Sequence, residues 1–427
     1  MLSIKFIKDQ DKKIKADLKK RFQEDKSKLV DEIIVAYDKW LPLKKDVEAL
    51  RHKRNVLSQE VNQLKKAGKD ASSKLKEVKA IPGKIAALEV KQKNLQEQMD
   101  NNLLQIPNIM HPKVPTGKDE TKNKVLRKWG VIKKVDFKLV NHGELVENLG
   151  LADFDAARKN SGHGFNYLFG DLALLDFALQ KYGLDFLLKK GFTPVIPPML
   201  LRHKTLLSVL NGLEDFKDVV YKIEDEDAFL IGTAEHPLAS LFANKTLSLE
   251  QLPLKLCAVT PCFRKEIGST GVDTKGLFRM HQFNKVEQVI FSSAEDSFKH
   301  LEEMQLITEK FFQSLKIPYR VVEICSGDLG AKFARQYDIE AWFPRQKAYR
   351  EVTSAGNCTD FQARALNTKY LDKKNEKQFV HILNNTMVAT SRAMVVILET
   401  YQQKDGSIKV PTVLQKYMGG LKKIGKR

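Results

Sequence analysis

The apolar residues between positions 43 and 104 recur at alternating intervals of four and three residues. This spacing is typical of the seam along which helices pack in a coiled coil. The residues form two series, one in each half of this region. Each series has a polar residue at one seam position, Arg54 in the first and Gln92 in the second. The apolar members are Leu43, Val47, Leu50, Leu57, Val61 and Leu64, followed by Ile81, Ile85, Leu88, Leu95 and Met99. The pattern therefore predicts two long helices.

The two series are close to mirror images, which predicts an antiparallel helical hairpin. Pairing Val47 with Met99 centres the turn near residue 73. The segment GKDASS at 68–73 supplies the glycine and the capping side chains that such a turn needs. Pro82-Gly83 is expected to kink the second helix or to delay its start.

The rest of the chain has a different character. Beyond the arm, IPNIMHPKVP at 106–115 is rich in Pro and Asn and predicts a linker. Residues 170–191 predict an amphipathic helix that Gly191 ends. FTPVIPPMLLR follows as an extended segment, and Pro197 and Pro198 exclude it from a central strand, so we expect an edge or interface strand.

These elements predict an α+β protein of two domains. Residues 1–110 form the helical domain with its coiled-coil arm, and residues 111–427 form a second domain. The second part mixes strands and helices without the regular βαβ alternation of a parallel sheet. It contains neither GxGxxG nor GxxxxGK[ST], which argues against a Rossmann or P-loop nucleotide site.

The net charge points to an anionic partner. The 427 residues carry a formal charge of +19, and a basic excess of this size most often indicates nucleic acid. The alternative is a Lys-rich, solvated surface. Between Leu43 and Leu104 there are 14 basic and 8 acidic residues. The arm alone leaves two interpretations open, a solvated coiled-coil surface or an arm that contacts an RNA backbone.

The cysteines and the N-terminal segment indicate a reducing compartment. No two of the four cysteines form a CxxC pair, so we expect neither a zinc site nor a disulfide framework. MLSIKFIKDQDKK has no apolar core of a signal peptide, and no apolar run approaches the length of a membrane span. The expected location is the cytoplasm, with no membrane partner.

The densest candidate chemistry lies between Pro261 and Gln288. The stretches KLCAVT and HQFNKVEQVIF predict the two strands of a long hairpin around a Gly-rich loop. Arg264 and Arg279 bracket the loop, and the carboxylates Glu266 and Glu287 lie beside them. Because guanidinium groups hold phosphate or carboxylate through a planar fork, this hairpin is a candidate nucleotide and acid site.

Three motifs together resemble a class II aminoacyl-tRNA synthetase, and specifically the seryl-tRNA synthetases. GFTPVIPPMLLR resembles the dimer-interface motif, with Pro198 at the motif proline. FRKE within the hairpin matches the class pattern FRxE, and NNTMVATSRAMVVILETYQ resembles the third motif, with Arg392. The start of this third motif is closer to archaeal and eukaryotic members than to bacterial ones. The resemblance covers nearly the whole chain and implies an antiparallel sheet flanked by helices behind the N-terminal hairpin.

The resemblance implies a nucleotide site for ATP and Mg²⁺. Arg264 would touch the α-phosphate and the serine carboxylate, and Arg392 would face the γ-phosphate; these two are the expected catalytic residues. Arg279 would lie by the terminal phosphates, and Phe283 would stack on adenine. Glu351 matches the family's magnesium ligand, with Ser354 beside it. The expected ATP-binding set is Arg264, Lys265, Glu266, Arg279, Met280, Phe283, Glu351, Val352, Thr353, Ser354 and Arg392.

The resemblance also implies a serine site. Thr233-Ala234-Glu235 matches the family's TAE loop, and Glu287 and Thr386 match its other serine contacts. The full expected serine-binding set is Thr233, Ala234, Glu235, Arg264, Glu287, Asn384 and Thr386. Taken singly, such glutamates are more often solvated or in structural ion pairs, Arg392 could be a buried structural arginine, and Thr386 could be a helix cap.

The implied activity is the joining of L-serine to its tRNA in a homodimer. The arm would bind tRNA(Ser), and also tRNA(Sec) where that exists. Two other classes stay open: a non-catalytic RNA-binding paralogue, which the presence of Arg264, Glu266, Glu351 and Arg392 disfavours, and an amino acid:carrier-protein ligase, which would lack the arm. Another small amino acid, threonine or glycine, is a further alternative that TAE, VEQ and the arm disfavour.

Overall fold

The computed structural model describes residues 1–210, 219–266 and 276–425. The chain divides into two compact units. One contains residues 2–19 and 23–107, and the other contains Met1, residues 20–22 and residues 108–427. Part of the Gly-rich loop expected between Arg264 and Arg279 lies outside the described residues.

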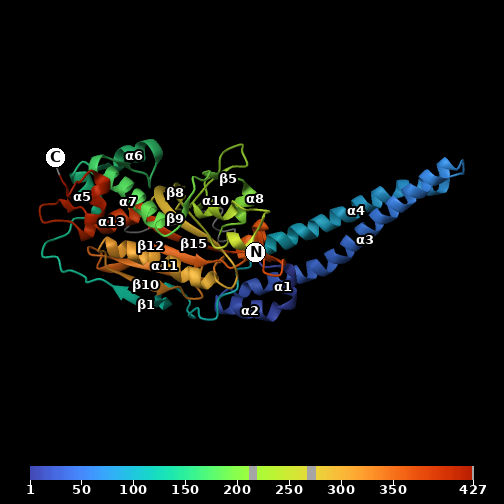
Figure 1. The fold of residues 1–427 in the computed structure, drawn as a ribbon, viewed down its shortest axis with the longest axis horizontal. Helices are drawn as coiled ribbons and strands as arrows, with labels where there is room; N and C mark the ends of the chain where they lie inside the picture. Colours follow the sequence, from blue (N-terminus) through green and yellow to red (C-terminus); the bar gives the residue numbers. More distant parts are fainter. Residues whose placement is uncertain (211–218, 267–275, 426–427) are drawn as a thin grey trace. The chain divides into compact units, whose positions relative to one another are not determined.

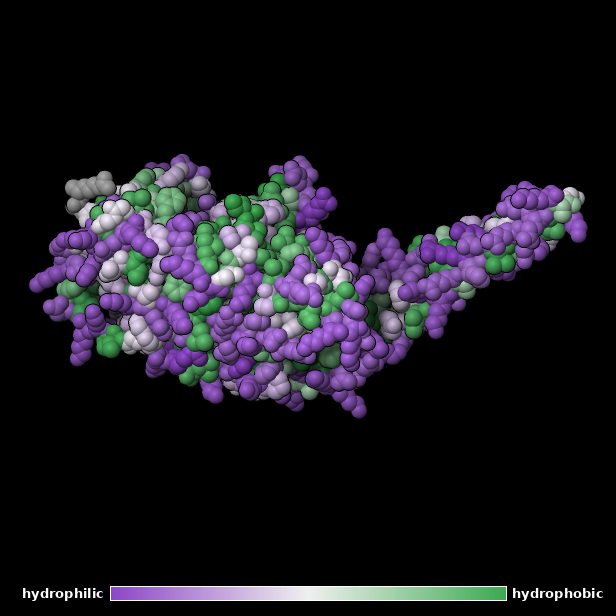
Figure 2. Space-filling model, viewed as in Figure 1, coloured by the Kyte–Doolittle hydropathy of each residue, from purple (hydrophilic) through white to green (hydrophobic). Residues whose placement is uncertain are grey.

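The first unit is helical. It consists of α1 (Ile4–Asp9), α2 (Asp11–Lys20), α3 (Ser27–Lys66) and α4 (Ser72–Leu103) (Figure 1). Helices α3 and α4 pack antiparallel through a core of Val47, Leu57, Ile81 and Ile85. Figure 2 shows that the exposed surface of this pair is mostly hydrophilic, with scattered apolar patches. The predicted two-helix coiled-coil arm is confirmed.

The register of the arm differs from the prediction. Arg51 pairs with Glu89 at 2.6 Å, whereas a turn centred at residue 73 would set Arg51 opposite Leu95. Helix α3 ends at Lys66, and the Asp70 carboxylate accepts from the Ser72 N–H at 2.8 Å, so the turn comes earlier. A heptad seam nearly repeats itself after a shift of about seven residues, so the apolar pattern alone does not distinguish neighbouring registers.

The prediction for Pro82 was also wrong with respect to the start of the second helix. Helix α4 begins at Ser72, ten residues before the proline, and Pro82 lies inside it. The loss of one backbone hydrogen bond is outweighed here by packing, because the neighbouring Ile81 is 3% exposed against α3. Pro42 is accommodated inside α3 in the same way.

The second unit is built on an eight-stranded sheet with the order β1-β10-β11-β12-β15-β9-β8-β4. Neighbouring strands are antiparallel except for β4 and β8, which are parallel. The strands are β1 (Lys124–Trp129), β4 (Thr193–Pro194), β8 (Leu254–Phe263), β9 (Gln282–Ser292), β10 (Tyr319–Glu323), β11 (Arg335–Phe343), β12 (Ala348–Asn357) and β15 (His381–Ala389). The predicted α+β class and antiparallel sheet are confirmed.

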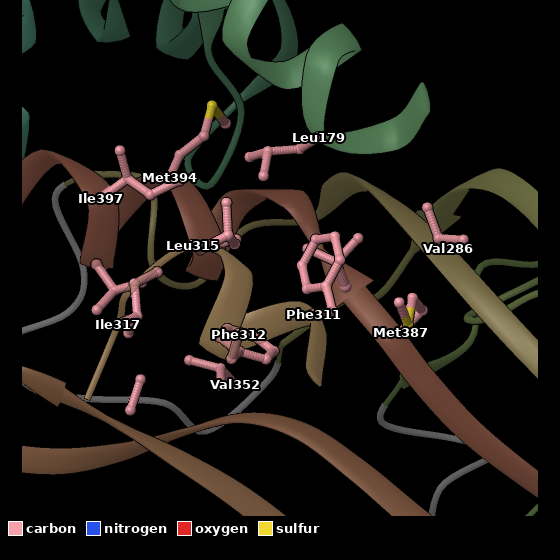
Figure 3. Packing of buried hydrophobic residues seen from close by; sticks show 14 of the residues in the cluster. Leu179, Val286, Phe311, Phe312, Leu315, Ile317, Val352, Met387, Met394 and Ile397 are labelled. Carbon is pink, nitrogen blue, oxygen red and sulfur yellow. The ribbon is translucent and has the colours of Figure 1, made fainter. Parts of the chain in front are cut away.

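Helices pack on this sheet to form two hydrophobic clusters. The main cluster includes α7 (Gly170–Leu188), α11 (Ser297–Ser314) and α13 (Thr390–Thr400), with α5 (His142–Asn148) packed on α13, and the second includes α10 (Glu235–Ser240) and α12 (Phe361–Leu366). Figure 3 shows Leu179 of α7 and Met394 of α13 approaching the same apolar layer as Phe311 of α11. This layer fixes the start of α13 against the sheet.

Helix α7 confirms the helix predicted at 170–191, but it is not simply amphipathic. Leu172 and Leu179 are fully buried, whereas Phe177 is 63% exposed and Leu174 is 41% exposed. The helix therefore presents apolar side chains on two faces. The sequence predicted a single apolar face because Leu174 and Phe177 are apolar and lie between the buried Leu172 and Leu179 in the chain. Their exposure cannot be read from their residue type.

Two connecting segments also bear on the prediction. Strand β4 lies at the edge of the sheet, as the adjacent prolines indicated. The supposed linker at 106–115 is anchored instead: Asn108 is 3% exposed and donates to the carbonyl oxygens of Lys332 and Cys358. Asn108 therefore serves to hydrogen-bond backbone carbonyls, which fixes the segment in place.

Candidate active site

The long hairpin predicted around FRKE is formed by β8 and β9, whose last pair is Phe263 with Gln282. This pairing brings Arg264 to the end of the sheet. Its backbone N–H donates to the His281 carbonyl at 2.9 Å, and its Nε donates to the Gly232 carbonyl at 3.1 Å. The guanidinium also lies 5.5 Å from the Phe283 ring centroid. Arg264 is thus fixed in direction before any ligand binds.

A cavity of about 140 Å³ opens beside this guanidinium. Strands β9, β12 and β15 and helix α13 contribute its walls, together with the residues that follow β8 and those that precede β9. The lining residues are Arg264, Glu266, Phe278, Arg279, Met280, Phe283, Lys285, Glu351, Val352, Thr353, Thr386, Ala389, Ser391 and Arg392. Nine of the eleven residues expected to bind ATP are among them; Lys265 and Ser354 are not.

The buried carboxylate of Glu287 accepts hydrogen bonds from three of the residues expected to bind serine. The hydroxyls of Thr233 and Thr386 donate to its Oε2 at 3.3 and 3.4 Å, and the amide of Asn384 donates to Oε1 at 3.5 Å. The Lys285 Nζ lies 2.6 Å from Oε2. Because alternate residues of a strand share a face, Phe283, Lys285 and Glu287 all project from β9 toward this side. Adenine-stacking and serine-selecting candidates therefore come from one strand face.

The other glutamate of the expected serine set has a different environment. Glu235 begins α10, is 3% exposed and pairs with the Lys332 Nζ at 2.6 Å. The Gln362 amide donates to the same oxygen at 2.9 Å. Burial opposes ionisation of this carboxyl, but the Lys332 ammonium holds the pKa of Glu235 below its usual value. Its charge is already balanced within the protein.

A β-bulge shapes the part of the site expected to face Mg²⁺. Ile339 pairs with Thr353 but Glu340 pairs with Glu351, so Val352 is the extra residue. Figure 3 shows Val352 in the apolar layer. Without the bulge, positions 351 and 354 would face opposite sides of the sheet; with it, Glu351 and Ser354 share a face. The bulge thus brings the two predicted oxygen donors together.

Arg392 completes the site from the first turn of α13. Its Nη1 lies 3.2 Å from the Glu351 Oε2 and donates to the Glu351 carbonyl at 3.2 Å. The Arg392 charge lowers the pKa of Glu351. Nearby, burial raises the pKa of Asp338 well above its usual value, and the Glu351 charge raises it further. Arg392 and Glu351 are therefore ionised side by side at the cavity wall.

Several residues of this site were not predicted from the sequence. Lys285 had a usable signal, since it stands two positions before Glu287 in a predicted strand. Phe278, whose ring centroid lies 5.3 Å from the Arg392 guanidinium, had no signal beyond its closeness to Arg279. Lys332 lies far along the chain from Glu235, and only the fold brings the two together. Asp338 lies opposite Ser354 on β11, the strand that precedes β12 in the chain.

An antiparallel sheet whose FRxE hairpin meets an arginine-bearing helix over one cavity is the catalytic core of a class II aminoacyl-tRNA synthetase. Residues 220–401 match the family model of the class II tRNA synthetase core domain (G, H, P, S and T). A prolyl-tRNA synthetase of Giardia lamblia shares the fold, with a TM-score of 0.57 at 16% identity over 64% of this chain and 54% of that chain.

Residues 1–110 match the model of the seryl-tRNA synthetase N-terminal domain. A serine–tRNA ligase of Methanoregula boonei is 46% identical over 98% of this chain and 99% of that protein. The structure of seryl-tRNA synthetase from Pyrococcus horikoshii complexed with ATP has a TM-score of 0.89 at 45% identity, covering 100% of both chains. The cytoplasmic serine–tRNA ligase of Naegleria fowleri, in complex with AMP, has a TM-score of 0.84 at 35% identity over 100% of this chain and 99% of that chain. This chain belongs to the seryl-tRNA synthetase family.

Proposed function

We propose that this chain activates L-serine with ATP to form seryl-adenylate and pyrophosphate, and then transfers the seryl group to tRNA(Ser). The observation that carries the proposal is the buried Glu287, toward which Thr233, Thr386 and Asn384 converge beside a cavity lined by Arg264 and Arg392. A carboxylate so placed suits a small ligand that carries both an ammonium and a hydroxyl.

In the activation step the serine carboxylate oxygen attacks the α-phosphorus of ATP, and the bond to the pyrophosphate oxygen breaks. Both reactants are anions, so positioning and charge stabilisation dominate the catalysis. Arg264 is oriented by Gly232 and Phe283 and would bridge the carboxylate and the α-phosphate. Arg279 and Arg392 would hold the terminal phosphates, with Phe283 stacked on adenine.

The residues on β12 fit a Mg²⁺ that ATP would bring with it. Among the described residues, no group of three His, Cys, Asp or Glu side chains forms a complete metal site. Mg²⁺ needs only one or two protein oxygens when phosphates and water supply the others. Glu351 and Ser354 offer two such oxygens on one face of β12. Asp338 is close enough for the Glu351 charge to raise its pKa. When bound, the ion would neutralise phosphate charge, while the chain's own residues position the reactants.

Serine would be selected by polar groups that need its hydroxyl. Loss of the hydroxyl in alanine would leave buried partners unpaired, and a site of this kind can reject such an analogue by about 10⁴–10⁵. Threonine would be excluded by lack of room. Glu287 would accept from the serine ammonium or hydroxyl in place of Lys285, its present partner. Thr233 offers the nearest hydroxyl of the TAE loop.

The helical arm would bind the tRNA. The arm from residue 43 to residue 104 carries 14 basic and 8 acidic residues, which favours contact with a phosphate backbone. tRNA(Sec) would be a second substrate where it exists. An amino acid:carrier-protein ligase is the less favoured assignment, because the 40-residue α3 and the 32-residue α4 are both present.

The functional form would be a homodimer. Ile196, which is 98% exposed after β4, lies in the dimer-interface motif, and Leu174 and Phe177 of the preceding helix α7 are exposed apolar side chains as well. A cytoplasmic location is supported by the four free cysteines, all of them buried. In the described parts of the chain, no helix is long and apolar enough to cross a membrane.

The proposal is tested by ATP–pyrophosphate exchange with each of the twenty amino acids, followed by charging of bulk tRNA. Exchange with serine and charging of serine tRNA are expected. Exchange with no amino acid would favour the non-catalytic paralogue. If the chain exchanges pyrophosphate with serine but transfers the serine to a carrier protein and not to tRNA, the carrier-protein ligase would be favoured.

A further inference from the structure

The backbone that leads from the loop of the hairpin into β9 is held by a histidine from a distant element. The Leu277 N–H donates to the His142 Nε2 at 3.2 Å, and both residues are buried. Gly276, just before, has φ +131°, and a Cβ built on it would lie 2.3 Å from the same nitrogen. The imidazole therefore packs directly on this backbone, and only glycine leaves room for it.

A carboxylate lies near the other ring nitrogen of His142, beyond hydrogen-bonding distance. Since Nε2 accepts a hydrogen bond, the neutral ring carries its hydrogen on Nδ1. Nδ1 lies 4.0 Å from Oε1 of Glu399, a 1% exposed residue near the end of α13. The other Glu399 oxygen accepts from the Arg345 N–H at 3.0 Å, which fixes the carboxylate in turn.

The two residues that follow Leu277 both line the ATP cavity. The Phe278 ring lies edge-on to Phe343 at 5.6 Å and close to the Arg392 guanidinium. Arg279 lies 3.4 Å from Glu266. A shift of the Leu277 backbone would therefore move Arg279, which is a candidate phosphate-binding residue. It would also move the Phe278 ring, which lies beside Arg392, the other candidate.

We propose that His142 is a positioning residue for ATP binding, which acts through the Leu277 N–H on Phe278 and Arg279 and has the Glu399 carboxylate near its Nδ1. His142 is not one of the described residues that line the cavity, so it would act without touching the nucleotide. Helix α13 then serves the site twice, directly through Arg392 and indirectly through Glu399, seven residues and about 10 Å further along its axis. This role rests on the proposed function, because it deepens the ATP site.

The test compares His142→Ala, His142→Gln and Glu399→Gln with the wild-type chain. The ATP dissociation constant is measured by equilibrium dialysis, and the KM values for ATP and serine are measured by pyrophosphate exchange. Loss of a hydrogen bond to a buried N–H should weaken ATP binding roughly tenfold in His142→Ala, with the KM for serine changed by less than about threefold. His142→Gln should recover most of the affinity, because its Oε1 can accept from Leu277. Glu399→Gln should weaken ATP binding by about threefold.

His381→Gln is the control, since it alters a partly buried histidine ring that is bonded to the Ser297 hydroxyl at 2.8 Å and, within the described ranges, makes no hydrogen bond or ring contact with Leu277 or Phe278. It should leave ATP binding within twofold of wild type. Wild-type ATP affinity in His142→Ala, or equal loss of ATP and serine affinity, would overturn the proposal. If His142→Ala does not fold, unchanged ATP binding in Glu399→Gln overturns it instead. A wild-type chain that binds ATP but exchanges no serine would refute the proposed function, while the ATP dissociation constants would still decide the role of His142.

Discussion

The Lys285 Nζ lies 2.6 Å from the Glu287 Oε2, and both side chains are buried two positions apart on β9. Lys285 also donates to the Thr386 hydroxyl at 3.4 Å, which itself donates to Glu287. Before a ligand arrives, Lys285 thus supplies the positive charge that Glu287 needs in the interior. A serine ammonium that binds Glu287 would take over part of this role. Lys285 would then be freed toward the ATP cavity, which it also lines.

Glu287→Ala should abolish serine activation while leaving ATP affinity within about threefold of wild type, since the carboxylate lies outside the set of described cavity-lining residues. Serine-dependent pyrophosphate exchange should fall by at least about a hundredfold, in line with loss of a charge-assisted contact of about 3 kcal/mol. Unchanged exchange in a folded Glu287→Ala variant would remove Glu287 from the serine site.

Lys285→Met should destabilise the chain, because it leaves the buried Glu287 carboxylate without its cation. Breaking one side of a buried ion pair costs about 3–5 kcal/mol, which urea unfolding would detect. Lys255→Met is the control: Lys255 pairs with Glu303 at 2.7 Å, but Glu303 is 40% exposed, so a loss of at most about 1 kcal/mol is expected. Equal losses in the two variants would contradict the assigned role of the buried pair.

His236 should make the folded state sensitive to mild acid. Burial lowers the pKa of His236 to about 3, whereas an unfolded histidine titrates near 6.5. Below pH 6.5 the unfolded state therefore binds a proton that the folded state rejects, and stability falls with pH by up to about 1.4 kcal/mol per unit. Between pH 7 and 5, His236→Gln should lose about 2 kcal/mol less stability than wild type.

The measurement is the free energy of unfolding in urea at pH 7, 6 and 5. His163→Gln, at an exposed position, is the comparison and should follow the wild-type profile. If His236→Gln runs parallel to wild type over this range, His236 takes up its proton in the folded state, and burial does not lower its pKa as described.

Deleting residues 45–100 should separate the two half-reactions. The cavity residues all lie in the second unit, so pyrophosphate exchange should stay within about threefold of wild type. Charging of tRNA should be lost, because the basic arm is gone. Charging that survives the deletion would show that the arm does not bind the tRNA.

The motifs predicted most of the cavity because they are local in sequence. FRKE and the hairpin around it needed only strand alternation and one turn, and β8 and β9 place Arg264, Phe283 and Glu287 accordingly. The arm was predicted for the same reason. Its register was not predicted, because several pairings of the two helices bury a similar set of apolar residues. Ion pairs such as Arg51–Glu89 and the turn at Asp70 decide which pairing forms. Pro82 showed that packing can override a local preference.

The features that the sequence did not predict depend on contacts between distant parts of the chain or on a local irregularity of a strand pair. Lys332 reaches Glu235 from almost a hundred positions away, and Asp338 comes near Glu351 through a strand pair whose bulge at Val352 carries no sequence signature. The anchored segment around Asn108 is similar, because its hydrogen bonds go to backbone carbonyls more than 200 positions further along. Such pairings follow from the topology of the sheet and not from local composition.

The most direct test of the central claim is pyrophosphate exchange by the wild-type chain with serine, alanine and threonine compared at equal concentrations. The arrangement around Glu287 predicts robust exchange with serine, with alanine weaker by about 10⁴ or more because its missing hydroxyl leaves buried polar groups unpaired. Threonine should be rejected by lack of room. Exchange with alanine or threonine at a rate close to that with serine, or no exchange with any of the three, would contradict the account.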